Sequence, residues 1–158
     1  MAAFESEVLS KKMKFMVEQT LTKNGNTSRM QILPGLTGEA TTPVTSDNTA
    51  LALGSGTVAV FATPALAALM EAAAVDALRT VLDDGQTSVG VHLDIQHLAA
   101  TPVGMSVRAE ARLMTVEGRR LTFRVAAFDG VEQVGVGTHQ RVVVDTERFM
   151  SRTAAKVR

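Results

Sequence analysis

One glutamate stands in the middle of the most apolar stretch of the chain. Glu71 is the only charged residue between Asp47 and Asp76, and every other residue at 64–75 is apolar. Taking a lone carboxylate out of water is costly, because burial disfavours the charged form. A segment that only filled a core would carry Ala or Leu at this position. Glu71 is therefore the first candidate for a catalytic acid, base or nucleophile.

Two further polar residues occupy positions where the pattern favours apolar ones. Thr63 begins the apolar stretch, and His97 ends the apolar face of an alternating segment, where Val or Leu is expected. Each candidate also has a structural explanation. Thr63 is a good helix N-cap, Glu71 could form a buried ion pair with an arginine, and His97 could be a hydrogen-bonded core histidine. Three inward polar groups together favour a functional site.

The residues around Glu71 predict a long buried helix over 63–82. Thr63 suits the N-cap and Pro64 the first helical position, while Asp83, Asp84 and Gly85 end the segment. The N-terminal half has no polar face, which is typical of a helix covered on all sides.

The remaining pattern predicts strands. These cover 36–44, 88–97, 106–116, 119–128 and 131–144, with a short helical turn at 50–53 and a terminal helix at 146–156. In 88–97 the odd positions, ending at His97, form the inward face, and His92 lies on the solvated face. On the last strand, Gly135 and Gly137 permit a bulge or close backbone approach. His139 shares a face with Arg141, so it either lines the site or is exposed. The order predicts an α+β domain with an antiparallel sheet wrapped around one central helix, completed by a partner subunit.

Bulk composition excludes several classes of protein. The 158 residues hold 16 Lys plus Arg, 16 Asp plus Glu and no Cys, so we expect no nucleic-acid partner, no disulfide and no thiolate nucleophile. We expect no metal and no cofactor. The longest apolar run is too short and too interrupted to span a bilayer, and no export signal is evident, which fits a cytoplasmic protein with no membrane partner. Residues 1–29 are predicted to be an extension, with an amphipathic helix at 6–21, and 30–158 the domain.

Five collinear motifs resemble the hot-dog-fold acyl-CoA thioesterases, in particular the fluoroacetyl-CoA thioesterase-like group. They are 61–64 (FATP) with 69–71 (LME), 97–104 (HLAATPVG), 116–121 (VEGRRL), 128–131 (FDGV) and 137–141 (GTHQR). The resemblance covers residues 36–149. It implies a homodimer or higher homo-oligomer with active sites at the subunit interface.

The resemblance also implies roles for single residues. Thr63, Glu71 and His97 match the family's catalytic set, Gly90 a glycine whose amide faces the thioester carbonyl, and Arg141 an arginine that holds the CoA portion. Thr57 stands where the fluoroacetyl-specific enzyme has an aromatic gate residue, so selectivity for the fluorinated substrate is not implied.

The expected activity is hydrolysis of an acyl-CoA thioester. The alternative is a non-catalytic hot-dog module that binds acyl-CoA. Glu71 would be the general base on water or a nucleophile, while Thr63 and His97 would position it and protonate the leaving thiolate. Arg119 or Arg120 would help to bind CoA phosphates. Thr63 and Glu71 are about 12 Å apart along a helix axis, too far for a direct hydrogen bond. They therefore address different parts of the substrate, or Thr63 reaches back from before the helix, or the pair comes from two subunits.

Overall fold

The computed structural model describes residues 31–157, so the predicted extension at 1–29 lies outside the described residues. The division of the chain at residue 30 stays a prediction. The elements follow the predicted order. They are β1 (Thr37–Pro43), the 3-10 turn η1 (Ser46–Asn48), α2 (Ala50–Leu53), α3 (Thr63–Leu78), β2 (Gln86–His97), β3 (Ser106–Glu117), β4 (Arg120–Phe128), β5 (Gln133–Asp145) and α4 (Thr146–Ala154).

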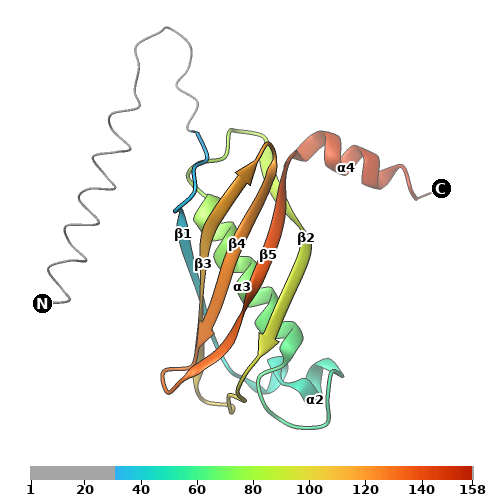
Figure 1. Ribbon diagram of the computed structural model, residues 1–158. Coiled ribbons are helices and arrows are strands. Elements are labelled where there is room, and N and C mark those ends of the chain that lie inside the picture. The colour runs from blue at the N-terminus through green and yellow to red at the C-terminus, as the bar shows by residue number, and fades with distance from the viewer. Residues whose placement is uncertain (1–30, 158) are drawn as a thin grey trace, which may run out of the picture. The chain divides into compact units, whose positions relative to one another are not determined.

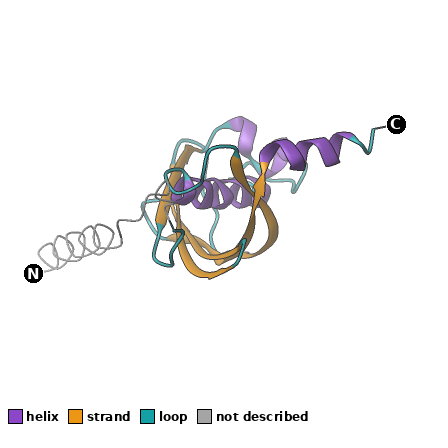
Figure 2. Ribbon diagram, turned by 90° about the horizontal axis from the view of Figure 1, so that it is seen from above, coloured by secondary structure: helices purple, strands orange, loops and turns teal. Residues whose placement is uncertain are grey.

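One antiparallel sheet curls around α3. Its strand order is β1-β3-β4-β5-β2, and every neighbouring pair is antiparallel. Figure 1 shows α3 lying across the sheet, and the view along the strands in Figure 2 shows the sheet bending around it. The architecture is therefore the hot-dog arrangement that the sequence predicts. Both β1 and β2 are edge strands of this sheet.

Glycines let α3 lie directly on the strands. A Cβ atom at Gly38 of β1 would overlap backbone atoms of Ala73 and Ala77. A Cβ atom at Gly135 of β5 would come 2.7 Å from the terminal methyl of Met70. Gly137 meets the backbone of β2 in the same way, which confirms the predicted close approach. The helix position is thus fixed by residues without side chains.

The ends of α3 differ from the prediction in a way that matters for Thr63. The N-cap is Ala62, which makes no side-chain capping bond, and Thr63 is the first helical residue. The hydroxyl of Thr63 is therefore not used as a cap. The helix ends at Leu78 rather than near 82, because the amides of Arg79 and Val81 turn back to the carbonyls of Asp76 and Leu78 and tighten the chain.

A bulge in β2 corrects the predicted alternation. Gly90 pairs with Arg141 and His92 with Gln140, which leaves Val91 as an extra residue between them. Before the bulge the even positions face α3, and after it the odd positions do. The prediction that the odd positions face inward is therefore right for His97 and wrong for Val89 and Val91. A regular strand would put Gly90 and His97 on opposite faces, because seven positions separate them. The bulge puts both on the side of α3.

The helix is only partly covered by residues 31–157. Its buried face holds Leu66, Leu69, Met70, Ala73, Ala74, Ala77 and Leu78. The opposite stripe, made of Pro64, Ala68, Ala72 and Val75, is exposed. Residues 31–157 therefore cover one side of the helix, and the cover expected from a partner subunit stays a prediction. No helix within residues 31–157 is long and apolar enough to cross a membrane.

Candidate active site

Thr63 and His97 form the first polar cluster, at the N-terminal end of α3. The hydroxyl oxygen of Thr63 lies 2.8 Å from Nδ1 of His97, at the end of β2. Thr63 is exposed, and His97 is half-buried. The structure therefore joins two of the three predicted catalytic residues. It also decides against the N-cap explanation of Thr63, because the hydroxyl bonds the imidazole and not a backbone amide.

The second nitrogen of His97 points into buried space. Its Nε2 atom is buried, and no hydrogen bond reaches it from any residue that the structure describes. Burial lowers the pKa of His97, and a nearby carbonyl at Ala99 opposes this only in part. The ring is thus favoured in its neutral form, with one nitrogen on Thr63. A cavity of about 340 Å³ adjoins the pair, lined by Ala50, Ser55, Val60, Phe61 and residues 98–100 besides the pair itself.

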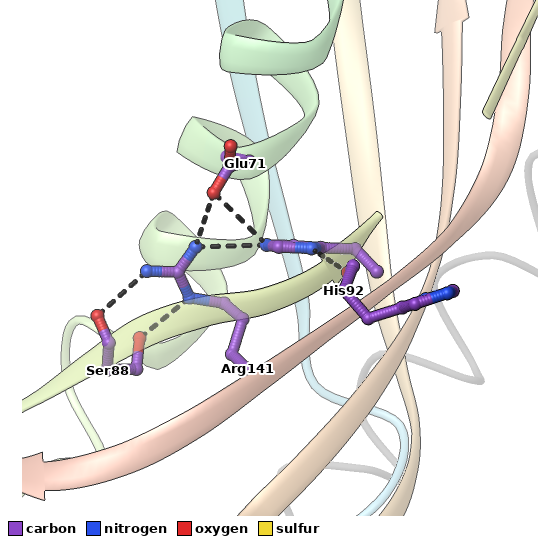
Figure 3. Close-up of polar contacts among 5 residues, drawn as sticks. Glu71, Ser88, His92 and Arg141 are labelled. Atoms are coloured by element: carbon purple, nitrogen blue, oxygen red, sulfur yellow. Dashed lines mark hydrogen bonds and ion pairs between the residues drawn. The ribbon is translucent and has the colours of Figure 1, made fainter. Parts of the chain in front are cut away.

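Glu71 belongs to a second cluster, two turns further along α3. Its Oε2 atom lies 3.4 Å from Nη1 of Arg141 and 3.6 Å from Nε2 of His139. Figure 3 shows the carboxylate pointing from α3 toward the side chains of β5. The Glu71 side chain keeps 42% of its surface exposed, so it is not the fully buried acid that the apolar stretch predicted. A carboxylate that is both held and accessible can meet a substrate.

Arg141 is held from three sides. Its Nε donates to Oγ of Ser88 and its Nη2 to the carbonyl of Ser88, both at 2.8 Å (Figure 3). Its side chain is only 6% exposed. Burial lowers the pKa of Arg141, while the adjacent carboxylate of Glu71 raises it and so offsets part of this effect. The structure thus places the predicted CoA-binding arginine beside the carboxylate, and its contact with CoA stays a prediction.

Gly90 lies directly against the carboxylate. A Cβ atom at this position would come 2.6 Å from Oε2 of Glu71 and 3.0 Å from Cε1 of His139. No side chain fits here while Glu71 holds its position. The structure therefore brings Gly90, Glu71 and Arg141 together, and it leaves Thr63 and His97 in the other cluster. Glu71 lies eight positions after Thr63 on the helix, about 12 Å along the axis.

The sequence did not identify Ser88 as a member of the second cluster, and it left the role of His139 open. His139 is buried and belongs to the cluster, where the pattern had left open a role in the site or simple exposure. Ser88 was not a candidate, because the bulge that turns it inward gives no sequence signal. Arg119 and Arg120, expected near CoA phosphates, are exposed at the β3–β4 turn, and Arg120 donates to Gln140.

The described residues offer no metal site. In residues 31–157 no three His, Asp or Glu side chains lie close enough together to hold a metal ion. The acidic and imidazole groups instead pair with an arginine and a threonine.

Comparison with known proteins gives this geometry a family. A family model described as fluoroacetyl-CoA-specific thioesterase matches residues 44–147, more than half of the chain. The chain belongs to this family. The matched region holds both polar clusters.

Individual relatives agree with the family. The fluoroacetyl-CoA thioesterase of Streptantibioticus cattleyicolor is 45% identical over 97 residues, which make up 61% of this chain and 70% of that protein. A solved structure of a fluoroacetyl-CoA thioesterase has a TM-score of 0.76 at 36% identity and covers 81% of this chain and 99% of its own. A Thermus thermophilus protein of the thioesterase superfamily has a TM-score of 0.73 at 28% identity, with coverages of 79% and 93%. The chain is thus a thioesterase with a hot-dog fold, as the motifs indicated.

Proposed function

We propose that this thioesterase hydrolyses an acyl-CoA to a free acid and CoA, with Glu71, Thr63 and His97 as its catalytic set. The observation that carries the proposal is that α3 supports two separate polar clusters, one around an accessible carboxylate and one around a hydroxyl–imidazole pair. Hydrolysis of a thioester needs both kinds of group. The carboxylate generates the nucleophile, and the hydroxyl–imidazole pair protonates the leaving thiolate.

The reaction can be assigned to these groups step by step. Glu71 takes a proton from water as the water oxygen attacks the carbonyl carbon, or its carboxylate attacks directly and forms an anhydride that water then cleaves. In either case the Gly90 amide would donate to the developing oxyanion. The C–S bond breaks as the tetrahedral centre collapses, and the thiolate takes a proton through Thr63 and His97, which solvent water replaces. A proton that Glu71 took from the attacking water returns to solvent.

A second copy of the chain would bring the two clusters together. The outermost strand β2 carries Gly90 near its middle and His97 at its end. If two β2 strands pair antiparallel across a two-fold axis, the His97 end of one lies beside the Gly90 region of the other. The Thr63–His97 pair of one copy then faces Glu71 of the second copy. The exposed apolar stripe of α3 supports the same arrangement, since a partner would cover it.

The role of Glu71 is tested by thiol release from acyl-CoA, followed with a thiol-reactive dye. The panel covers short, long, aryl and fluoroacetyl-CoA substrates. Glu71→Gln should lower kcat by at least about 100-fold, the usual loss when a general base is removed. Asp76→Asn is the matched control, because Asp76 lies on the same helix but contacts Arg79 and the amide of Glu39. Wild-type turnover in Glu71→Gln would sink the proposed role.

The shared site is tested by mixing two inactive variants. If each site takes Glu71 from one copy and Thr63 from the other, mixed dimers of Glu71→Gln and Thr63→Val hold one intact site and one doubly changed site. Random exchange makes half of the dimers mixed, so activity should return to about one quarter of wild type. No recovery after verified subunit exchange would place all three residues in one chain.

A further inference from the structure

A buried histidine lies between the carboxylate and the arginine and has no part in the proposed steps. His139 is 1% exposed, the least accessible charged or titratable side chain of the second cluster. Buried polar side chains normally have hydrogen-bond partners, and the identity of those partners decides what the ring can do. His139 has polar partners at both ring nitrogens.

The two partners fix which nitrogen carries the proton. Nδ1 of His139 lies 2.9 Å from the backbone carbonyl of His92, which can only accept a hydrogen bond. Nδ1 therefore carries the hydrogen. Nε2 lies 3.0 Å from Nη1 of Arg141, and a guanidinium can only donate. Nε2 is therefore bare and accepts, so the ring is neutral with a defined tautomer.

The neutral ring explains the geometry around Glu71. With Nε2 bare, its 3.6 Å approach to Oε2 of Glu71 is not an ion pair, because both atoms are acceptors. Oε2 of Glu71 and Nε2 of His139 both face Nη1 of Arg141, which has two hydrogens and can donate one to each acceptor. Together with the two bonds to Ser88, four of the five N–H hydrogens of Arg141 have partners. The guanidinium is thereby fixed in plane and in rotation.

We propose that His139 is a positioning residue, which as a neutral acceptor holds Arg141 in the orientation that presents Nη1 to the Glu71 carboxylate. This inference rests on the proposed catalytic role of Glu71. His139 does not touch the substrate in this scheme. It acts through Arg141, and Arg141 in turn holds Oε2 of Glu71 beside Gly90, where a freely rotating carboxylate would sample other positions.

The surroundings of the ring support a neutral state. Burial lowers the pKa of His139, and the adjacent positive charge of Arg141 lowers it further, while the carbonyl of His92 and the carboxylate of Glu71 oppose this in part. The charged or titratable groups that face the ring are Glu71 from α3, His92 from β2 and Arg141 from its own strand. A protonated Nε2 would turn its hydrogen toward the Nη1 hydrogens of Arg141 and break the arrangement.

The test compares two replacements of His139 that differ in one property. Gln can place its carbonyl oxygen near the position of Nε2 and accept from Arg141, whereas Leu fills part of the volume and accepts nothing. His139→Leu should lower kcat about 10- to 100-fold with KM little changed, the range for partners that orient a functional group. His139→Gln should recover most of this loss. Thr138→Val is the matched control, since Thr138 is the neighbouring residue on the exposed face of β5.

A structural role would give a different result. It would lower the melting temperature of both variants and the fraction of active protein, with no separation of kcat from KM and no recovery by Gln. Wild-type kcat in His139→Leu beside an inactive Glu71→Gln would overturn the inference and leave the proposed function standing. An active Glu71→Gln would overturn both.

A second measurement stays informative if His139→Leu fails to fold. A long-range ¹H–¹⁵N NMR spectrum of the wild-type protein shows which nitrogen of each histidine carries the proton. His139 should show a protonated Nδ1 and a bare Nε2 at neutral pH. A protonated Nε2, with or without a second proton on Nδ1, would contradict the proposal whatever the activity of the variants.

Discussion

The hydroxyl of Thr63 lies 2.8 Å from Nδ1 of His97, a contact between the first residue of α3 and the last residue of β2. A threonine before a helix ordinarily caps the helix with its side chain, but here Ala62 is the cap residue and makes no such bond. The hydroxyl is thus committed to an imidazole and remains exposed to solvent.

Thr63→Val should therefore affect catalysis and not the fold. Valine keeps the shape but removes the hydroxyl, so kcat should fall by about 100-fold, while Thr63→Ser should retain most activity. Loss of a true N-cap would cost about 1 kcal/mol. Urea unfolding of both variants should show a change well below this value. A loss of stability without a loss of kcat would restore the capping explanation.

Gly90→Ala, like Thr63→Val, should lower activity and leave stability nearly unchanged. The added Cβ would lie 2.6 Å from Oε2 of Glu71, the mobile end of a side chain, and Gly90 has no positive φ that would strain alanine. The carboxylate moves aside, so the melting temperature changes little. We expect kcat to fall by about 10-fold or more, because a small misplacement of a reacting group is costly. Thiol release and thermal unfolding measured on one preparation check both parts.

Gly38→Ala should instead lower the stability of the fold. Its Cβ would overlap the backbone of Ala73 and Ala77, which cannot rotate away as a side chain can. Overpacking of this kind costs about 1–3 kcal/mol, and we expect the upper end. Gly56→Ala is the control, since its Cβ would lie 3.2 Å from the Cβ of Ala50 in an exposed loop and should cost far less. Equal free energies of unfolding for the two variants would show that α3 does not rest on β1 as described.

Stability should fall as the pH is lowered through the histidine range. The pKa of His139 in the folded protein lies below its ordinary value of 6.5, mainly because the ring is buried. Well above pH 6.5 the ring is neutral in both the folded and the unfolded protein, so its titration does not change the free energy of unfolding. As the pH falls through 6.5, the unfolded chain takes up the proton first, so the free energy of unfolding decreases until the folded ring also titrates. His97 contributes with the same sign.

Urea unfolding at a series of pH values between about 8 and 5 checks this dependence, above the range in which most carboxylates titrate. His139→Gln should give a flatter profile than wild type, because glutamine does not titrate. A profile that keeps its slope in this variant would assign the effect to other groups.

The sequence predicted the fold well because its signals are local. The apolar stretch around Glu71 and the alternation in β3, β4 and β5 each follow from the period of one element. The predicted strands leave short breaks at 117–118 and 129–130, and the glycines there, Gly118 and Gly130, adopt positive φ. The same signals identified His97 as an inward polar residue. What they predicted poorly was the degree of burial of Glu71, which depends on how far the sheet reaches around α3.

The members of the second cluster were harder to predict, for a physical reason. Ser88 and Gly90 face α3 together with His97 because Val91 is left out of the pairing with β5, and a bulge is a relation between two strands that neither strand shows alone. His139 was visible as a residue on the same face as Arg141. Whether that face was buried depended on β2 and α3, which come from distant parts of the chain.

The bulge at Val91 has a consequence for how β2 can vary. Six residues lie between Gly90 and His97, which in a regular strand would put the two on opposite faces, and the bulge absorbs one of the six. Exchanging the Val91 side chain changes little in this register. Deleting Val91 would join Gly90 to His92, which already pair with the neighbouring residues Arg141 and Gln140, so the ladder would become regular and both Gly90 and His97 would still face the helix. The bulge thus lets β2 hold one residue more than its pairing with β5 uses, while both polar clusters stay on the side of α3.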